Sequence, residues 1–254
     1  MIHLLTLEEA ALLMAKLSDS AYNNDNQEIF SQLGFNEYKF LEHNDAEGHL
    51  AASDTEVIIT CRGTQPNQPS DLLADLNAFP KTNGTGWVHK GFRREARKLL
   101  PEVLAWAEKH KGKDIFVTGH SLGAAMALYL VQELEFAGHS HIELYTFGSP
   151  RLGNEEYIAQ IKSPHWRFVN CNDLVTHVPP QALGFEHYGE LCYINFYGNI
   201  RPLTTYQRFK DRLRAHWHDL KNFRLFDGIQ DHLMTGYITK LEKIRDSGQK
   251  INQL

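Results

Sequence analysis

The sequence lacks a long apolar segment, an excess of basic residues and any low-complexity spacer that would separate two domains. No apolar run reaches the roughly 18–20 residues that a membrane-spanning helix needs. The formal net charge of −5 argues against a general nucleic-acid binder, because such proteins carry a basic excess. The 254 residues contain no internal repeat and no Pro-, Gly- or Ser-rich spacer. We therefore expect one domain over residues 1–254.

Cysteines are few and do not form a recognisable pattern. Cys61, Cys171 and Cys192 cannot all pair, and none lies in a CxxC sequence or in a Cys/His arrangement with metal-ligand spacing. We expect three reduced thiols in or near buried strands. A disulfide between Cys171 and Cys192 stays open at this point.

The first residues, MIHLLTLEEAALLMAK, resemble a signal peptide only superficially, because Glu8 and Glu9 interrupt the apolar stretch. Thr6 followed by Glu9 is the pattern of a capping box, which predicts a helix that begins after Thr6. The sequence thus gives no Sec-type export signal. A cytoplasmic location and export by a route not visible in the sequence both stay open.

Short apolar runs alternate with longer helical patterns along most of the chain. The runs that predict strands cover residues 56–64, 114–120, 141–150, 166–173 and 191–198. Amphipathic or small-residue patterns predict helices over residues 92–110 and immediately after Ser121. Continuous apolar strands separated by helices indicate an α/β fold with a mostly parallel sheet covered on both faces. In such sheets, ligands bind at the carboxyl ends of the strands.

One of those strand ends carries a nucleophile motif. Gly119-His120-Ser121-Leu122-Gly123 fits G-x-S-x-G, with a strand before it and a helix after it. Small residues are needed because the turn is so sharp that larger side chains would collide with neighbouring backbone. A second Gly-His-Ser occurs at residues 138–140, but it has no glycine two residues after its serine and it precedes a strand. We therefore predict that Ser140 is a loop residue.

With five further motifs, the chain resembles the class 3 (fungal-type) lipases of the α/β-hydrolase superfamily. These motifs are CRGT (61–64), VHKGF (88–92), FGSPRLGN (147–154), NDLVTHVPP (172–180) and HYGELCYI (187–194). Two departures are small: Ala124 stands where the family often has glycine, and Cys61 replaces a more usual aromatic residue. The resemblance implies an α/β-hydrolase fold and the hydrolysis of lipid esters.

A serine nucleophile needs a histidine to take its proton and an acid to orient the imidazole. In α/β-hydrolases the order along the chain is serine, acid, histidine. Asp173 follows the apolar run FVNC and matches the acid of the family motif. Of the five histidines after it, His232 resembles the late Asp-His of the family, and we select it as the base. His187 matches the family's structural histidine and is the reserve candidate.

The oxyanion of an acyl-transfer intermediate needs two backbone donors, one of them from the residue after the nucleophile. That residue is Leu122, and the resemblance assigns the second donor to Thr64. The resemblance also implies a lid helix after Thr64. Residues 69–79 fit it, with an apolar face formed by Leu72, Leu73, Leu76 and Phe79. A plain surface helix packed on the core fits the same residues.

A basic segment lies outside these motifs. Residues 201–224 contain seven basic residues and two acids, a local net charge of +5, which leaves −10 on the rest of the chain. Tyr206, Phe209, Leu213 and Trp217 follow one another at roughly helical spacing, so we expect a basic helical insertion. One interpretation is a helix with a solvated basic face. The other is docking to an anionic lipid surface.

Together these features predict a carboxylic ester hydrolase that acts on lipid esters through an acyl-enzyme. Ser121 attacks, His232 is base and then acid, Asp173 orients His232, and Thr64 and Leu122 hold the oxyanion. Neither a metal nor an organic cofactor is required, and the expected partners are the lipid ester and its interface. A phospholipase A1 or a short-chain esterase is the alternative among enzymes. A catalytically silent, hydrolase-like lipid-binding module is the alternative outside them.

Overall fold

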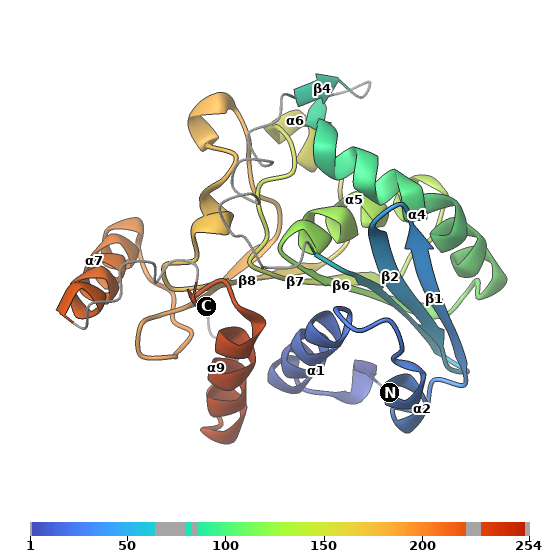
Figure 1. Cartoon of the computed structure of the whole chain (residues 1–254), viewed down its shortest axis with the longest axis horizontal. Coiled ribbons are helices and arrows are strands. Elements are labelled where there is room, and N and C mark those ends of the chain that lie inside the picture. Colours follow the sequence, from blue (N-terminus) through green and yellow to red (C-terminus); the bar gives the residue numbers. More distant parts are fainter. Residues whose placement is uncertain (1, 64–79, 83–85, 222–229, 252–254) are drawn as a thin grey trace.

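A seven-stranded sheet forms the centre of the molecule (Figure 1). The computed structural model describes residues 2–63, 80–82, 86–221 and 230–251. The strands lie in the order β1 (Glu37–His43), β2 (Ala46–Ala52), β3 (Glu56–Cys61), β6 (Asp114–His120), β7 (Ile142–Phe147), β8 (His165–Asn170) and β9 (Glu190–Ile194). A small second sheet pairs β4 (Pro80–Thr82) with β5 (Trp87–His89).

Strands β3, β6, β7, β8 and β9 of the large sheet are parallel to one another, as the apolar runs predict. β1 and β2 were not predicted, and they add an antiparallel hairpin at one edge. Asn44 and Asp45 make its turn in the left-handed region, with φ of 45° and 68°. Asparagine and aspartate tolerate this conformation better than other residues with a side chain. The outer strand β1 is largely exposed or half-buried, so its sequence lacks the apolar run that marks the inner strands.

Helices cover both faces of this sheet (Figure 1). On one face lie α4 (Lys90–Lys109) and α5 (Leu122–Phe136), and on the other lie α1 (Leu7–Ser20) and α9 (Met234–Asp246). The other helices in the described part of the chain are α2 (Gln27–Gln32), α6 (Glu155–Ile158), α7 (Thr205–Lys221) and the 3-10 turns η1 (Ile2–Leu4), η2 (Leu174–His177) and η3 (Gln181–Leu183). The predicted capping box is present: Thr6 Oγ1 accepts from the Glu9 amide, and the Glu9 carboxylate accepts from the Thr6 amide.

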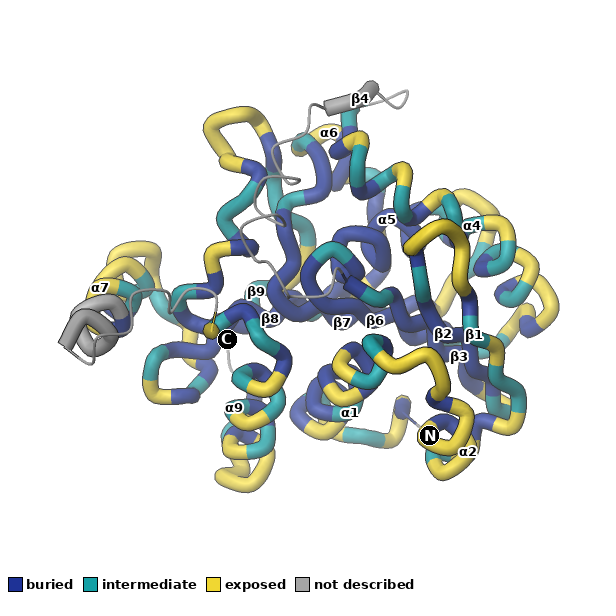
Figure 2. Tube along the Cα trace, in the orientation of Figure 1, coloured by how far each residue is buried: buried dark blue, intermediate teal, exposed yellow. Residues whose placement is uncertain are grey.

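Two apolar cores hold the helices to the sheet, one on each face. α5 is apolar nearly all round, and its residues from Gly123 to Gln132 are all buried. A helix of this kind is fixed by packing on every side. The start of α5, where Ser121 lies, is therefore held firmly against the end of β6 (Figure 2).

The three cysteines are free and buried, so the Cys171–Cys192 disulfide is not formed. Burial raises the pKa of each thiol to about 12. The predicted lid, residues 69–79, lies outside the described residues. Within the part of the chain that the structure describes, no helix is both long and apolar enough to cross a membrane.

Candidate active site

Ser121 sits in a strained turn between β6 and α5. Its backbone has φ of 59° and ψ of −128°, a conformation that residues with a side chain rarely adopt. A Cβ at Gly119 would lie 2.4 Å from the Gly123 carbonyl oxygen, and one at Gly123 would lie 2.2 Å from the Cys61 carbonyl oxygen. The two glycines of the motif are thus required by close backbone approach.

The turn leaves the serine hydroxyl available. The Ser121 amide donates to the Phe147 carbonyl at 3.0 Å, which fixes the turn against β7. The residue is 1% exposed, yet its Oγ has no hydrogen-bond partner among the described residues. Leu122 is the first residue of α5, and the amides of a helix's first turn lack intrahelical partners. The helix dipole adds positive potential at the same place.

Asp173 and His232 form a buried pair beside this turn. His232 Nδ1 lies 2.9 Å from both carboxylate oxygens of Asp173, and the two residues are 5% and 0% exposed. Because a carboxylate only accepts, Nδ1 carries the proton and Nε2 is the free acceptor. His232 Nε2 has no partner in the described part of the chain. The imidazole therefore has the tautomer that a general base needs.

Further hydrogen bonds satisfy the Asp173 carboxylate. Tyr237 Oη donates to Oδ2 at 2.6 Å, and the Val175 amide donates to Oδ1 at 3.0 Å. Burial alone would raise the pKa of Asp173. The electrostatic attraction and hydrogen bond of His232 and the hydrogen bond of Tyr237 outweigh it, and the pKa is lowered. Asp173 is thus held as a carboxylate while it also caps η2.

His120, the residue before the serine, holds His232 from behind. Its Nε2 lies 2.7 Å from the His232 carbonyl oxygen, and the two rings are 4.5 Å apart between centroids. Since a carbonyl only accepts, Nε2 of His120 carries the proton, and Nδ1 accepts from Tyr22 Oη at 2.8 Å. Burial, and then the neighbouring His232, lower the pKa of His120 to about 3. His120 is therefore a neutral hydrogen-bonding residue that positions His232.

The loops that carry Asp173 and His232 are tied to each other. The Asn170 side chain donates to the Asp231 carbonyl at 2.9 Å, and the Asn172 amide donates to the Asp231 carboxylate at 3.0 Å. These bonds join the residues just before Asp173 to the residue just before His232. The distance between acid and base is thus set by the backbone as well as by their own side chains.

The other predicted site residues have different outcomes. Thr64 lies outside the described residues, so its role stays a prediction. Its neighbour Gly63 approaches the serine, since a Cβ there would lie 3.3 Å from Ser121 Cβ. His187 is not beside the acid: its Nε2 donates to the Thr176 carbonyl at 2.8 Å and so holds η2. The structure pairs Asp173 with His232 and not with the reserve candidate.

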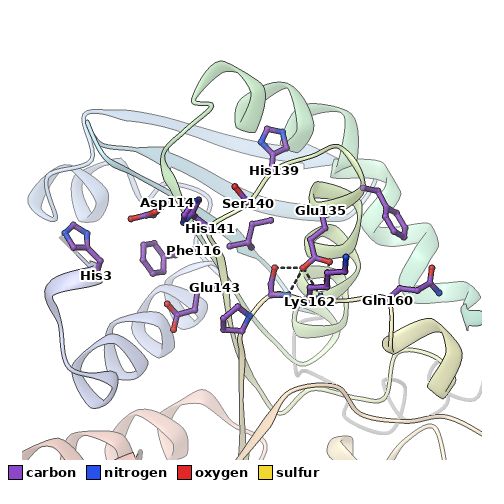
Figure 3. A pocket seen from close by; sticks show the side chains of 14 residues that line it. His3, Asp114, Phe116, Glu135, His139, Ser140, His141, Glu143, Gln160 and Lys162 are labelled. Atoms are coloured by element: carbon purple, nitrogen blue, oxygen red, sulfur yellow. Dashed lines mark hydrogen bonds between the residues drawn. The ribbon is translucent and has the colours of Figure 1, made fainter.

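The second Gly-His-Ser lies at the opposite end of the parallel strands. Ser140 lines a cavity of about 630 Å³ near the first residues of β6 and β7, whereas Ser121 follows the last residue of β6. Ser140 is a loop residue, as predicted. Figure 3 shows His139 and His141 beside it, with no hydrogen bond from Ser140 to either ring. This serine has no base among the residues drawn there.

Residues 58–183 match the family described as lipase (class 3). The chain belongs to the class 3 lipase family. The matched segment includes Ser121 and Asp173 and ends before His232, so the assignment of the histidine rests on its hydrogen bonds to Asp173.

Several of the proteins that resemble this chain are fungal lipases. A lipase of Rhizomucor miehei is 36% identical over 165 residues, which cover 59% of this chain and 45% of that protein. Lipase II of Rhizopus niveus superposes with a TM-score of 0.63 at 25% identity, over 74% of this chain and 80% of that one. A triacylglycerol lipase whose catalytic centre is a serine protease triad superposes with a TM-score of 0.61 at 27% identity, over 73% and 79%.

These likenesses confirm the predicted α/β-hydrolase fold. The chain spans less than half the length of the curated fungal lipases that it matches. Tyr22, His120 and Tyr237 were not predicted to take part in the site. Tyr22 and Tyr237 lie outside the family motifs, and only the folded chain brings them to His120 and Asp173.

Proposed function

We propose that this class 3 lipase family member hydrolyses carboxylic esters of lipids through an acyl-enzyme. The observation that carries the proposal is the strained backbone of Ser121, whose hydroxyl has no hydrogen-bond partner among the described residues, together with the buried Asp173–His232 pair. The substrate class is supported by the Rhizomucor miehei relative, which is a lipase, and by the similar structure of a triacylglycerol lipase.

In this mechanism the Ser121 oxygen attacks the ester carbonyl carbon while its proton passes to His232 Nε2. Asp173 stabilises the imidazolium through Nδ1 and keeps its own negative charge. The amides of Leu122 and Thr64 would bind the oxyanion, and each such donor contributes about 3–4 kcal/mol of transition-state stabilisation. The intermediate collapses, the alcohol leaves with the proton from His232, and water repeats the sequence on the acyl-serine.

Turnover of a soluble p-nitrophenyl ester tests the nucleophile. We expect Ser121→Ala to lower kcat/KM by at least about a thousandfold, since a nucleophile is removed. Ser140→Ala is the matched control, because it removes the other serine of a Gly-His-Ser sequence, and we expect unchanged kinetics. Equal rates for Ser121→Ala and the wild type would reject the proposed nucleophile.

The base is tested with a second pair of variants. His232→Ala removes the proton acceptor, whereas His187→Ala removes a hydrogen bond to the Thr176 carbonyl. We expect a loss of several orders of magnitude only in the first variant, with thermal unfolding used to show that both are folded. If only His187→Ala abolishes turnover, the assignment of His232 is wrong.

A further inference from the structure

The outward side of α7 carries large apolar side chains. Tyr206, Phe209 and Leu213 are 64%, 56% and 41% exposed. Residues three and four apart lie on one face of a helix, so these three form a single stripe. Figure 2 shows most of the described part of α7 in the colour of exposed residues. The stripe therefore lies at the surface and is not part of either core.

The inward side of the same helix carries a buried aspartate. Asp211 is buried and accepts hydrogen bonds from Tyr193 Oη at 3.1 Å and from the Phe196 amide at 2.9 Å. Ala215, four residues on, is also buried. A surface helix ordinarily turns its apolar stripe to the core and its charges to water. α7 is anchored by an aspartate and exposes its aromatic residues, which is the arrangement expected of a docking surface.

The charges around this stripe are of one sign. Within residues 201–215, five basic residues accompany a single acid, the buried Asp211, so the local net charge is +4 while the whole chain carries −5. Lys210 Nζ lies 4.5 Å from the centre of the Tyr206 ring, and the Arg214 guanidinium lies 5.5 Å from that of the exposed Tyr197. Aromatic rings interleaved with cations fit a surface that is apolar inside and anionic outside.

This face adjoins the proposed catalytic acid. Cys171, two residues before Asp173, places its Sγ 3.6 Å from the Asp211 carboxylate. Leu174, the residue after Asp173, is 41% exposed. The side chain that anchors α7 is thus in contact with the loop that carries Asp173, and the exposed stripe lies on the outer side of that contact.

We propose that the exposed face of α7, formed by Tyr206, Phe209 and Leu213 with Lys210 and Arg214, docks the protein onto an anionic lipid surface. The rings enter the headgroup region while the two cations meet lipid phosphates or carboxylates. The acidic remainder of the chain is repelled by the same surface, so docking also orients the molecule. This inference goes beyond ester hydrolysis, because binding does not require turnover.

Vesicle flotation tests the docking surface in a Ser121→Ala background, so that hydrolysis cannot alter the lipid. The vesicles are phosphatidylcholine alone or phosphatidylcholine with phosphatidylserine. We expect binding only with phosphatidylserine, and a decline with salt. A basic residue near such a surface contributes about fivefold in binding, so Lys210→Glu with Arg214→Glu should weaken it by at least about 25-fold.

Matched variants separate the apolar and electrostatic contributions. Phe209→Ser should weaken binding by about tenfold or more, since a buried phenyl ring is lost from the docked state. Phe136→Ser, at a similarly exposed phenylalanine at the end of α5, and Arg94→Glu on α4 should leave binding unchanged. Hydrolysis of a soluble ester by the same variants with Ser121 restored reports on the proposed function separately.

Three outcomes would overturn the proposal. The first is equal binding to vesicles with and without phosphatidylserine. The second is unchanged binding of the Lys210→Glu, Arg214→Glu variant. The third is a dimer in sedimentation that Phe209→Ser dissociates, because the stripe would then be covered by a second copy of the chain.

Discussion

Gly148 offers a sensitive test of the proposed site, because it lies against the acid and the base together. A Cβ at this position would lie 2.7 Å from Asp173 Oδ2, 2.8 Å from His232 Nδ1 and 2.9 Å from His232 Cε1. Its φ is +59°, which is the left-handed region. Gly148→Ala therefore adds one methyl group at the centre of the pair without removing any functional group.

The size of the effect follows from these distances. Ordinary contacts of a Cβ begin at 3.4 Å, so the Asp173 oxygen must retreat by about 0.7 Å. Neither side chain can simply swing away, because both are buried and hydrogen-bonded. A displacement of about 1 Å in a catalytic arrangement can cost about a hundredfold in rate. We expect kcat/KM to fall by about that factor.

Gly112→Ala is the matched control. Gly112 has φ of +90°, and a Cβ there would meet nothing within 4 Å. Both variants place an alanine in the left-handed region, which lowers stability by about 1–2 kcal/mol. Only Gly148→Ala also disturbs the Asp173–His232 pair. Kinetics with a soluble ester and thermal unfolding are measured for both. If Gly148→Ala keeps the activity of Gly112→Ala, the Asp173–His232 geometry does not govern the rate and the reasoning fails.

Other side-chain contacts have measurable consequences for stability. Tyr237→Phe removes the hydroxyl that donates to Asp173 and should cost about 1–3 kcal/mol in the free energy of unfolding, measured by urea denaturation; an unchanged midpoint would show that this bond adds nothing. Thr6→Ala removes the capping box of α1 and should cost about 1 kcal/mol by the same assay, whereas alanine at the exposed Ser31 should not. The free energy of unfolding should decrease as the pH drops below about 6.5. The reason is that histidines with a depressed native pKa bind protons in the unfolded chain but not in the folded one, and each such histidine costs about 2 kcal/mol of stability by pH 5. Denaturation midpoints at pH 7.5 and pH 5 check this, and a flat profile would contradict the burial of these rings. Burial, the first cause in each case, lowers the pKa of four histidines to about 3 or 4: His49, His120, His165 and His177.

Features of the fold that depend on local sequence were predictable. The turn around Ser121 needs glycine two residues before and after it, and the inner parallel strands need continuous apolar runs, so both leave a local signature. The β1–β2 hairpin leaves a weaker signature in the sequence, because most side chains of its outer strand β1 are exposed or half-buried. Strand 191–198 was predicted too long, since β9 ends at Ile194.

The supporting contacts of the site depend on folding over long distances. Tyr22 meets His120 from 98 residues away, and Tyr237 meets Asp173 from 64 residues away. A tyrosine on an amphipathic helix looks the same in sequence whether it packs in the core or orients a catalytic acid. His232 was selected by its order after Asp173 and by family resemblance, and the hydrogen bonds to Asp173 supply the geometry that order alone could not.

The contacts between the two ends of the chain bear on how the protein is made. Tyr22, just after α1, supports His120, while His232 directly precedes the last helix, α9, which packs with α1 in one core. The Ile251 amide also donates to the Glu8 carboxylate at 2.6 Å. During synthesis the nucleophile emerges long before the base, so a nascent chain that already contains Ser121 stays inactive. The proposed hydrolysis therefore requires α9 to have docked onto α1, because only then is His232 in place beside Ser121.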